Sequence, residues 1–253
     1  NGGIIGVNGS AFSYQTGRAS PLGMCIKNGV IYGNYETSYS VMAVKYDGTI
    51  YTPEQGLKGE ALLEEGVKDT YNFGPILIKD GQAQPAWSET AKYYPRTAVG
   101  MVKPGIYVLL VTDTGSYAGL NHWDLVNIFN SYGCQYAYNL DGGGSTAISV
   151  WYPGQSAISI KNIPSDGRPR SCATYLLLVD DEKGDGVPAR LALKEEGQTV
   201  LTGSEFTLPG AVALDKGLNV TNSNVTDVAI TSGSGLGTIS GGVCTAGGQR
   251  GVE

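Results

Sequence analysis

The alternation of hydrophobic and polar positions along the 253-residue chain predicts many short strands and few helices. Short apolar runs recur between turns rich in Gly, Asn and Asp, which is typical of strands. Residues 23–26 and 30–32 flank the turn at residues 27–29, so they predict a hairpin with an Asn-Gly turn. Residues 75–79, followed by an Asp-Gly pair, predict another strand and turn. The continuous apolar run at residues 106–111 is typical of a central strand buried on both faces.

Two segments predict helices. Residues 59–68 form the shorter one. The stronger pattern covers residues 121–132, where Asn121 can cap the helix and Asp124 can close a capping box. Apolar residues at helical spacing give this segment one hydrophobic face, and Gly133 is placed to end it.

Strand-like patterns continue after this helix. Residues 134–140 predict a strand with Tyr136 and Tyr138 on one face. Residues 147–152 predict the next strand, and the turn between the two spans residues 141–146.

The composition changes along the chain and predicts two folded parts. Residues 1–181 read as an α+β domain, with a mixed β-sheet and few helices. Residues 182–187 are charged and glycine-rich and predict a linker. Residues 188–253 predict a small all-β segment that resembles bacterial immunoglobulin-like modules, complete or truncated, with its clearest strands at residues 189–194 and 225–230.

The charge and the residue counts exclude several classes of function. The net charge is −6 and no Lys/Arg cluster occurs, which argues against binding to nucleic acid. The single histidine, His122, cannot build a His-rich metal site, and we interpret it as structural. The four cysteines form no C-x-x-C pair, which argues against a Cys-based zinc site. We predict no metal ligands and no cofactor.

Further features bear on localisation. No apolar run is long enough to span a membrane. Charged residues make up only 16% of the chain, which is low for an intracellular protein, so we expect a secreted or cell-surface protein. No signal peptide is visible, and both ends have the pattern of a fragment of a longer precursor.

The segment Asp141–Thr146 places three glycines between an acidic residue and two hydroxyl residues. Glycine suits positions where the backbone takes positive φ or closely approaches a ligand. Successive amides in such a turn can form a nest for an anion. The turn lacks the lysine of a P-loop and is not followed by a helix, as a dinucleotide-binding turn would be. On residue types alone, a ligand-free turn and an anion-binding turn beside Asp141 both stay open.

Four other polar residues lie where predicted strands begin or end. Arg96 precedes an apolar strand, and Asp113 follows the long apolar run. Asn8 lies in a tight turn after an apolar segment, and Arg168 lies in a loop that leads into one. Ligand sites often gather at strand ends, but each of these side chains is also compatible with a solvated or structural role.

Seven segments resemble, in order, the motifs of the phosphodiester glycosidase family. The resemblance covers about residues 4–180, and its most specific part is the segment Asn139–Thr146. The other matching segments are residues 7–12, 21–29, 73–81, 95–100, 110–113 and 161–169.

The resemblance implies a hydrolase that cleaves the sugar C–O bond of a glycosyl-1-phosphodiester such as an N-acetylglucosamine-1-phosphodiester. It implies catalytic roles for Asp141, Arg96 and Arg168, with Asp141 acting at the anomeric carbon as nucleophile or base. The arginines and the amides of the glycine turn would neutralise the departing phosphate. The residues implied to bind substrate or orient the site are Asn8, Asp113, Gly142, Gly143, Gly144, Ser145, Thr146 and Asn162.

Three other classes compete with this interpretation. The first is a module that binds phosphodiester-containing cell-surface polysaccharide without cleaving it. The second is a metal-dependent phosphodiesterase that cuts the P–O bond, although no dense group of Asp and Glu occurs in the sequence. The third is a structural surface protein, which leaves the glycine turn without a role.

Overall fold

The computed structural model forms two compact units. The larger unit comprises residues 5–150 and 159–178, and the smaller unit comprises residues 1–4, 151–158 and 179–253. The structure describes residues 3–15, 18–84, 92–113, 119–152, 155, 157–194, 201–207, 210–225, 237–240 and 242–248.

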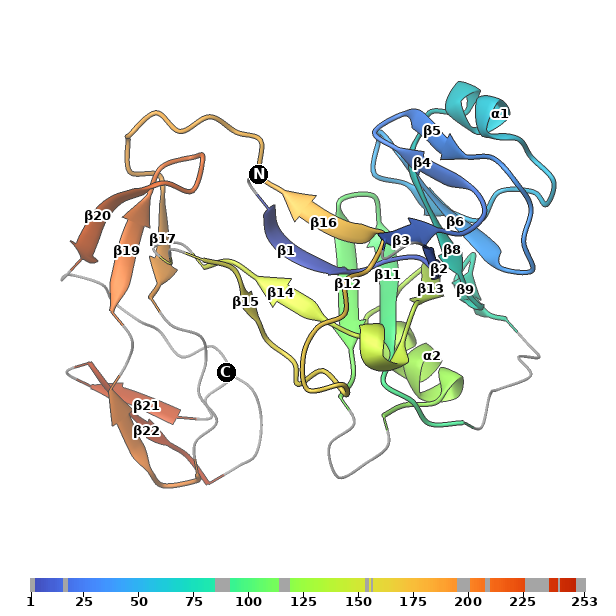
Figure 1. Cartoon of the computed structure of the whole chain (residues 1–253). Coiled ribbons are helices and arrows are strands. Elements are labelled where there is room, and N and C mark those ends of the chain that lie inside the picture. Colours follow the sequence, from blue (N-terminus) through green and yellow to red (C-terminus); the bar gives the residue numbers. More distant parts are fainter. Residues whose placement is uncertain are drawn as a thin grey trace. The chain divides into compact units, whose positions relative to one another are not determined.

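The elements that lie wholly or mainly in the larger unit are mostly short strands (Figure 1). In chain order they are β1 (Gly3–Asn8), β2 (Phe12–Gln15), β3 (Arg18–Pro21), β4 (Cys25–Lys27), β5 (Val30–Gly33), β6 (Ser40–Lys45), β7 (Ile50–Tyr51), α1 (Gly59–Glu64), β8 (Val67–Phe73), β9 (Ile76–Lys79), β10 (Gln82–Ala83), β11 (Thr97–Lys103), β12 (Ile106–Val111), α2 (His122–Ser131), β13 (Tyr136–Leu140), the 3-10 turn η1 (Gly143–Ser145), β14 (Ile148–Val150), β15 (Ser159–Ile160) and β16 (Tyr175–Val179).

A five-stranded antiparallel sheet, in the order β10-β9-β13-β11-β12, forms the centre of the larger unit. Alternate residues of β13 point to opposite faces, as the period of two requires. Tyr136, Tyr138 and Leu140 pack with residues of β1, β6 and β8 on one face. Ala137 packs on the other face, against α2. The predicted α+β class is therefore confirmed at this level, with strands outnumbering helices.

The predicted helix at residues 121–132 is confirmed as α2. The Asn121 side chain accepts a hydrogen bond from the Asp124 main-chain amide at 2.9 Å, and the Asp124 carboxylate accepts one from the Asn121 main-chain amide at 3.1 Å. This reciprocal capping box fixes where the helix starts. Gly133, with φ of 73°, follows its end.

Two predictions for the larger unit were wrong in part. The helix expected at residues 59–68 ends at Glu64, because Gly66 takes positive φ and the chain then enters β8. The run at residues 106–111 forms β12, but this strand lies at the edge of the five-stranded sheet as described and is partly exposed. The central strand is β13, whose tyrosines do not form a continuous aliphatic run.

The predicted Asn-Gly hairpin is confirmed as β4 and β5. Asn28 and Gly29 both have positive φ, at 49° and 73°, as a tight hairpin turn requires. Strand β9 is likewise followed by two residues of positive φ, Asp80 and Gly81.

The smaller unit contains two three-stranded sheets, ordered β17-β19-β20 and β18-β22-β21. Its strands are β17 (Arg190–Leu193), β18 (Glu205–Thr207), β19 (Ala211–Leu214), β20 (Val220–Val225), β21 (Gly237–Ser240) and β22 (Val243–Ala246). The strand predicted at residues 189–194 is confirmed as β17. Residues 226–230, the rest of the other predicted strand, lie outside the described residues. The immunoglobulin-like topology stays a prediction.

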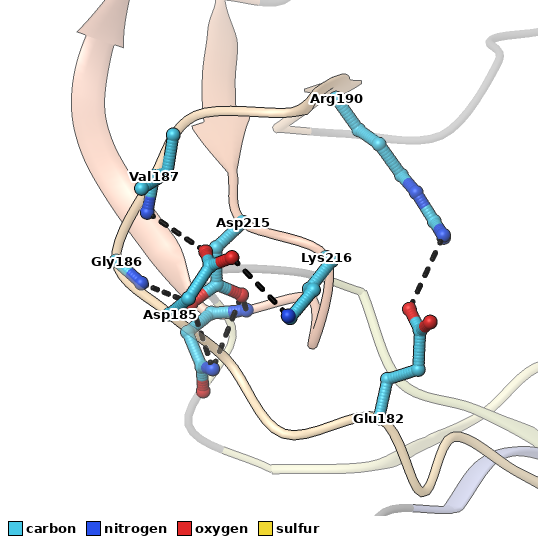
Figure 2. Close-up of polar contacts among 8 residues, drawn as sticks. Glu182, Asp185, Gly186, Val187, Arg190, Asp215 and Lys216 are labelled. Atoms are coloured by element: carbon cyan, nitrogen blue, oxygen red, sulfur yellow. Dashed lines mark hydrogen bonds and ion pairs between the residues drawn. The ribbon is translucent and has the colours of Figure 1, made fainter.

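The segment predicted as a linker, residues 182–187, is hydrogen-bonded to the turn after β19 (Figure 2). The buried Asp215 carboxylate accepts the Gly186 amide at 3.1 Å and the Asn219 amide at 2.9 Å. Lys216 lies 3.3 Å from the Asp185 carboxylate. Burial opposes ionisation of Asp215, but the amide donors outweigh it and hold its pKa below the usual value.

We expect Asp215→Ala to lower the thermal midpoint of the smaller unit at neutral pH, because two amides lose their acceptor. A lowered folded-state pKa means that the carboxylate stabilises the fold above its unfolded pKa of about 3.9. This stabilisation is lost as the pH falls through the lower folded value. The difference between variant and wild type should therefore shrink in acid, as measured by circular dichroism melts, with amide exchange in β19 and β20 locating the transition.

The control is Glu182→Gln, which removes an exposed ion pair of 3.7 Å with Arg190. Exposed pairs contribute little to stability. Equal midpoints for the two variants at neutral pH would contradict a stabilising role for Asp215.

Candidate active site

Three strands begin or terminate at the same end of the five-stranded sheet. Strand β13 ends immediately before Asp141, and β11 begins immediately after Arg96. Thr97 of β11 pairs with Leu140 of β13 on one side and with Val111 of β12 on the other. Because neighbouring strands run antiparallel, the last residues of β13 and β12 and the first residue of β11 lie side by side at this end of the sheet. The register thus gathers residues that are far apart in the sequence.

The buried side chain of Asn8 ties these segments together. Its Nδ2 donates to the main-chain carbonyl of Asp141 at 2.6 Å. Its Oδ1 accepts from the Thr97 hydroxyl at 2.6 Å and from the Ala147 amide at 3.1 Å. Both ends of the amide are therefore bound to protein. In this conformation Asn8 positions Asp141, which is one of the two roles that the sequence suggested.

Asp113 and Asn162 form a second set of hydrogen bonds that holds the same turn. Asn162 Nδ2 donates to the Asp113 carboxylate and to the Thr146 carbonyl, each at 3.0 Å, while its Oδ1 accepts the Ile148 amide at 2.9 Å. Asp113 also accepts the Ile163 amide at 3.0 Å. These two residues orient the glycine turn.

The amides of the glycine turn do not form the predicted anion nest. The chain closes into the 3-10 turn η1, which uses the Ser145 amide to Gly142 and the Thr146 amide to Gly143. The Gly143 amide donates to Pro95 at 2.8 Å, and the Gly142 amide donates to Oδ1 of Asp141 at 3.0 Å. Among the described residues, only the Gly144 amide of this turn has no acceptor.

The turn instead presents two buried hydroxyl groups. Ser145 and Thr146 are 2% and 1% exposed, and neither hydroxyl has a hydrogen-bond partner among the described residues. The Ser145 hydroxyl lies beside Asp141 and favours its ionised form without reaching hydrogen-bond geometry. Unpartnered buried hydroxyls are costly in a folded core, and they are typical of functional sites.

The carboxylate of Asp141 lies in an environment that shifts its protonation. Burial raises its pKa above the usual value. The Ser145 hydroxyl, the Gly142 amide and the charge of Arg170 act in the opposite direction but do not cancel the effect of burial. Removing a carboxylate from water disfavours its charge, and such groups often act as bases or nucleophiles.

The arginine whose charge acts on this carboxylate is Arg170, which was not among the predicted site residues. Its Nε donates to the Asp166 carboxylate at 2.5 Å, and its guanidinium lies directly over Gly144. Arg168, which was predicted, and Arg170 are both exposed, but of the two only Arg170 acts on the charge of Asp141. The sequence places both arginines around one proline, and only the path of the backbone decides which of them acts on Asp141.

Arg96 lies behind the turn with its guanidinium buried. Its Nε donates to the Leu120 carbonyl and its Nη2 to the Lys92 carbonyl, each at 3.2 Å. The guanidinium also lies 5.1 Å from the centre of the Tyr94 ring. These contacts hold the chain around the start of β11, so the guanidinium of the predicted catalytic Arg96 is engaged with Leu120, Lys92 and Tyr94.

The family model for phosphodiester glycosidases matches residues 1–179. The chain belongs to the phosphodiester glycosidase family. It is 27% identical over 210 residues to an SPbeta prophage-derived uncharacterized protein, YomE, of Bacillus subtilis (strain 168), covering 79% of this chain and 31% of that protein. Its fold is similar to the catalytic domain of zebrafish N-acetylglucosamine-1-phosphodiester alpha-N-acetylglucosaminidase auto-inhibited by its pro-peptide, with a TM-score of 0.57 and 23% identity.

That comparison covers 71% of this chain and 64% of the zebrafish chain. The chain thus spans less than two thirds of the length of both relatives. The match to the family model contains the whole cluster built around Asp141.

Cys172 lies in the cluster of this phosphodiester glycosidase as well. Burial raises the pKa of its thiol, and the nearby Asp141 raises it further, while Ser145 and Arg170 oppose them. A raised pKa keeps the thiol protonated at neutral pH. Asp141 is therefore better placed than Cys172 to act as a nucleophile or base. In the part of the chain that the structure describes, no group of three or more His, Cys, Asp or Glu could hold a metal, and no helix is long and apolar enough to cross a membrane.

Two glycines of the turn should respond differently to an added methyl group. A Cβ at Gly142 would lie 2.7 Å from the Pro95 carbonyl oxygen, which is backbone and cannot easily move. A Cβ at Gly144 would meet the flexible end of Arg170 and the Asp166 carboxylate. We expect Gly142→Ala to lower the free energy of unfolding by about 1–3 kcal/mol, the usual cost of overpacking.

We expect Gly144→Ala to fold with a smaller loss, because side chains can give way, but to displace Arg170. Chemical denaturation of the two variants measures the difference. Equal stability of Gly142→Ala and wild type would contradict this packing.

Proposed function

We propose that this phosphodiester glycosidase hydrolyses the C–O bond between a sugar's anomeric carbon and the phosphate of a glycosyl-1-phosphodiester. The observation that carries the proposal is the partly buried Asp141 carboxylate, which lies at a strand end where the Ser145 hydroxyl and the charge of Arg170 both act on it. The proposed substrate class includes N-acetylglucosamine-1-phosphodiesters and phosphodiester-containing cell-surface polysaccharide.

The two charges of the reaction match the two charges of the site. As the bond breaks, the sugar becomes positive at its anomeric carbon, and a carboxylate stabilises an oxocarbenium-like centre. The departing phosphate gains negative charge, which the nearby guanidinium of Arg170 would neutralise. Water supplies the hydroxyl of the released sugar, the phosphate leaves as a monoester, and one proton passes to solvent.

The other predicted residues have supporting roles in this proposal. Asn8, Asp113 and Asn162 hold Asp141 and the glycine turn in place through the hydrogen bonds described above. Arg96 holds the start of β11, next to the glycine turn, through its bonds to the Leu120 and Lys92 carbonyls. Arg168, exposed in the same loop as Arg170, would contact the part of the substrate beyond the phosphate.

Hydrolysis in ¹⁸O-labelled water tests the proposal directly. We expect label in the released sugar, because water attacks carbon, and we expect Asp141→Asn to lower kcat by at least about 10²-fold. Label in the phosphate would instead show P–O cleavage. Tight binding of a broad panel of glycosyl-1-phosphodiesters without turnover would favour the non-catalytic binding module.

The stability of Asp141→Asn separates a catalytic from a structural role. Because folding raises the pKa of Asp141, its ionised form destabilises the fold at neutral pH. The variant should therefore unfold at an equal or higher temperature than wild type while it loses activity. A variant that loses both together would point to a structural role.

The acid limb of the pH–activity profile should depend on Arg170. If Asp141 must be ionised, kcat/KM falls as the pH drops below its pKa. Arg170→Gln removes a charge that lowers this pKa, so the limb should move to higher pH and kcat should fall at least about tenfold. Arg170→Lys should shift the limb less.

Arg168→Gln is the matched comparison, since Arg168 lies two residues away and is exposed. We expect it to leave the acid limb in place, whatever its effect on KM. A shift in Arg168→Gln without one in Arg170→Gln would assign the phosphate contact to Arg168.

A further inference from the structure

A cavity of about 360 Å³ lies in the larger unit between residues 34–40 and residues 52–58. Its lining includes no residue of the glycine turn and none of the residues assigned above to cleavage. Its volume is within the range of small-molecule sites.

The buried floor of this cavity contains an unsatisfied acceptor. Asn72 is 1% exposed and lines the cavity together with Met24 and Leu62. Its Nδ2 donates to the Leu22 carbonyl at 2.9 Å and to the Met24 carbonyl at 2.5 Å, which fixes the orientation of the amide. Its Oδ1 is buried and has no partner among the described residues. This oxygen has less than 1 Å² of accessible surface, so it does not open into the cavity, and Asn72 shapes the floor without contacting a ligand.

Two exposed tyrosines stand among the lining residues. Tyr35 is 50% exposed and Tyr39 is 37% exposed, although both rings are large and apolar. Tyr39 stacks on Phe73 with ring centres 5.7 Å apart and an angle of 9° between the rings. This stacking holds one ring in a fixed plane at the cavity.

The polar lining also favours a ligand rich in donors. Glu36 and Glu54 contribute two carboxylates, against the single cation of Lys58. One positive and two negative side chains leave a charge of −1, which disfavours an anionic ligand. Carboxylate and amide oxygens accept hydrogen bonds from hydroxyl groups.

The walls are held in place without a ligand. The Asn34 side chain accepts the Gly59 amide at 3.0 Å, and Tyr138 donates to the Ser40 carbonyl at 2.5 Å. The Thr52 and Tyr136 hydroxyls lie 2.6 Å apart. Both segments that line the cavity are therefore anchored to the core, which lowers the entropy lost on binding.

We propose that this cavity binds a neutral sugar ring, with Tyr35 and Tyr39 against its apolar face and Glu36 and Glu54 accepting from its hydroxyls. The site is separate from the Asp141 cluster and does not depend on the cleavage proposed there. It would give the protein a second contact with a glycan, apart from the phosphodiester.

Saturation-transfer NMR with neutral oligosaccharides of glucose, galactose, mannose and N-acetylglucosamine tests this site at millimolar concentrations. We expect binding by the whole chain, weakened at least about tenfold in Tyr35→Ala and in Glu54→Gln, a loss equivalent to about 1.4 kcal/mol. The control is Tyr132→Ala, because Tyr132 is 62% exposed and is not part of the cavity lining.

Binding should persist in Asp141→Asn, which separates this site from the proposed catalytic one. Loss of binding in Asp141→Asn but not in Tyr35→Ala or Glu54→Gln would place the sugar at the glycine turn and overturn the proposal. Absence of binding across the whole panel by correctly folded wild-type protein would also overturn it, and neither result would affect the test for cleavage in labelled water.

Discussion

The hydrogen bonds of the Asn8 side chain hold the candidate site together. One amide group joins the end of β1 to Asp141, to Thr97 of β11 and to Ala147 before β14. These partners are 89 to 139 residues away along the chain. A buried amide with both ends satisfied is stable, and one with an end left open is costly. The position of the Asp141 backbone therefore depends on the whole of the larger unit having folded.

This dependence has a chemical consequence. The turn after β13 is held so that the Asp141 carboxylate is partly buried, and this burial raises its pKa. The same folding leaves the Ser145 and Thr146 hydroxyls without hydrogen-bond partners in the part of the chain that the structure describes. The fold thus maintains several local arrangements that cost stability, and they occur together at one strand end. Such costs are expected where a protein binds or transforms a ligand.

The cavity lined by Asn72 is a second place where a polar atom is left unsatisfied. It is built from connecting segments rather than from strand ends. Its floor is nevertheless linked to the candidate site through residues 9 and 10. The main-chain amide of Asn72 donates to the Ser10 hydroxyl at 3.1 Å, and the main-chain amide of Asp141 donates to the Gly9 carbonyl at 3.0 Å. Variants in the floor of the cavity could therefore disturb the cluster, whereas variants at its exposed tyrosines should not.

The sequence by itself determined the features that arise from local interactions. The Asn121 and Asp124 capping box and the Asn28-Gly29 turn follow from the conformations of a few neighbouring residues, and both were predicted correctly. The family was also readable, because its motifs keep their order along the chain. Only the tertiary structure placed β12 at an edge and β13 at the centre, since strand order depends on pairing between distant segments. The tertiary structure also determined that the charge of Arg170, and not that of Arg168, acts on Asp141, and that most amides of the glycine turn donate to the protein itself. A side chain's neighbours across the fold decide such matters, and those neighbours are not adjacent in the sequence.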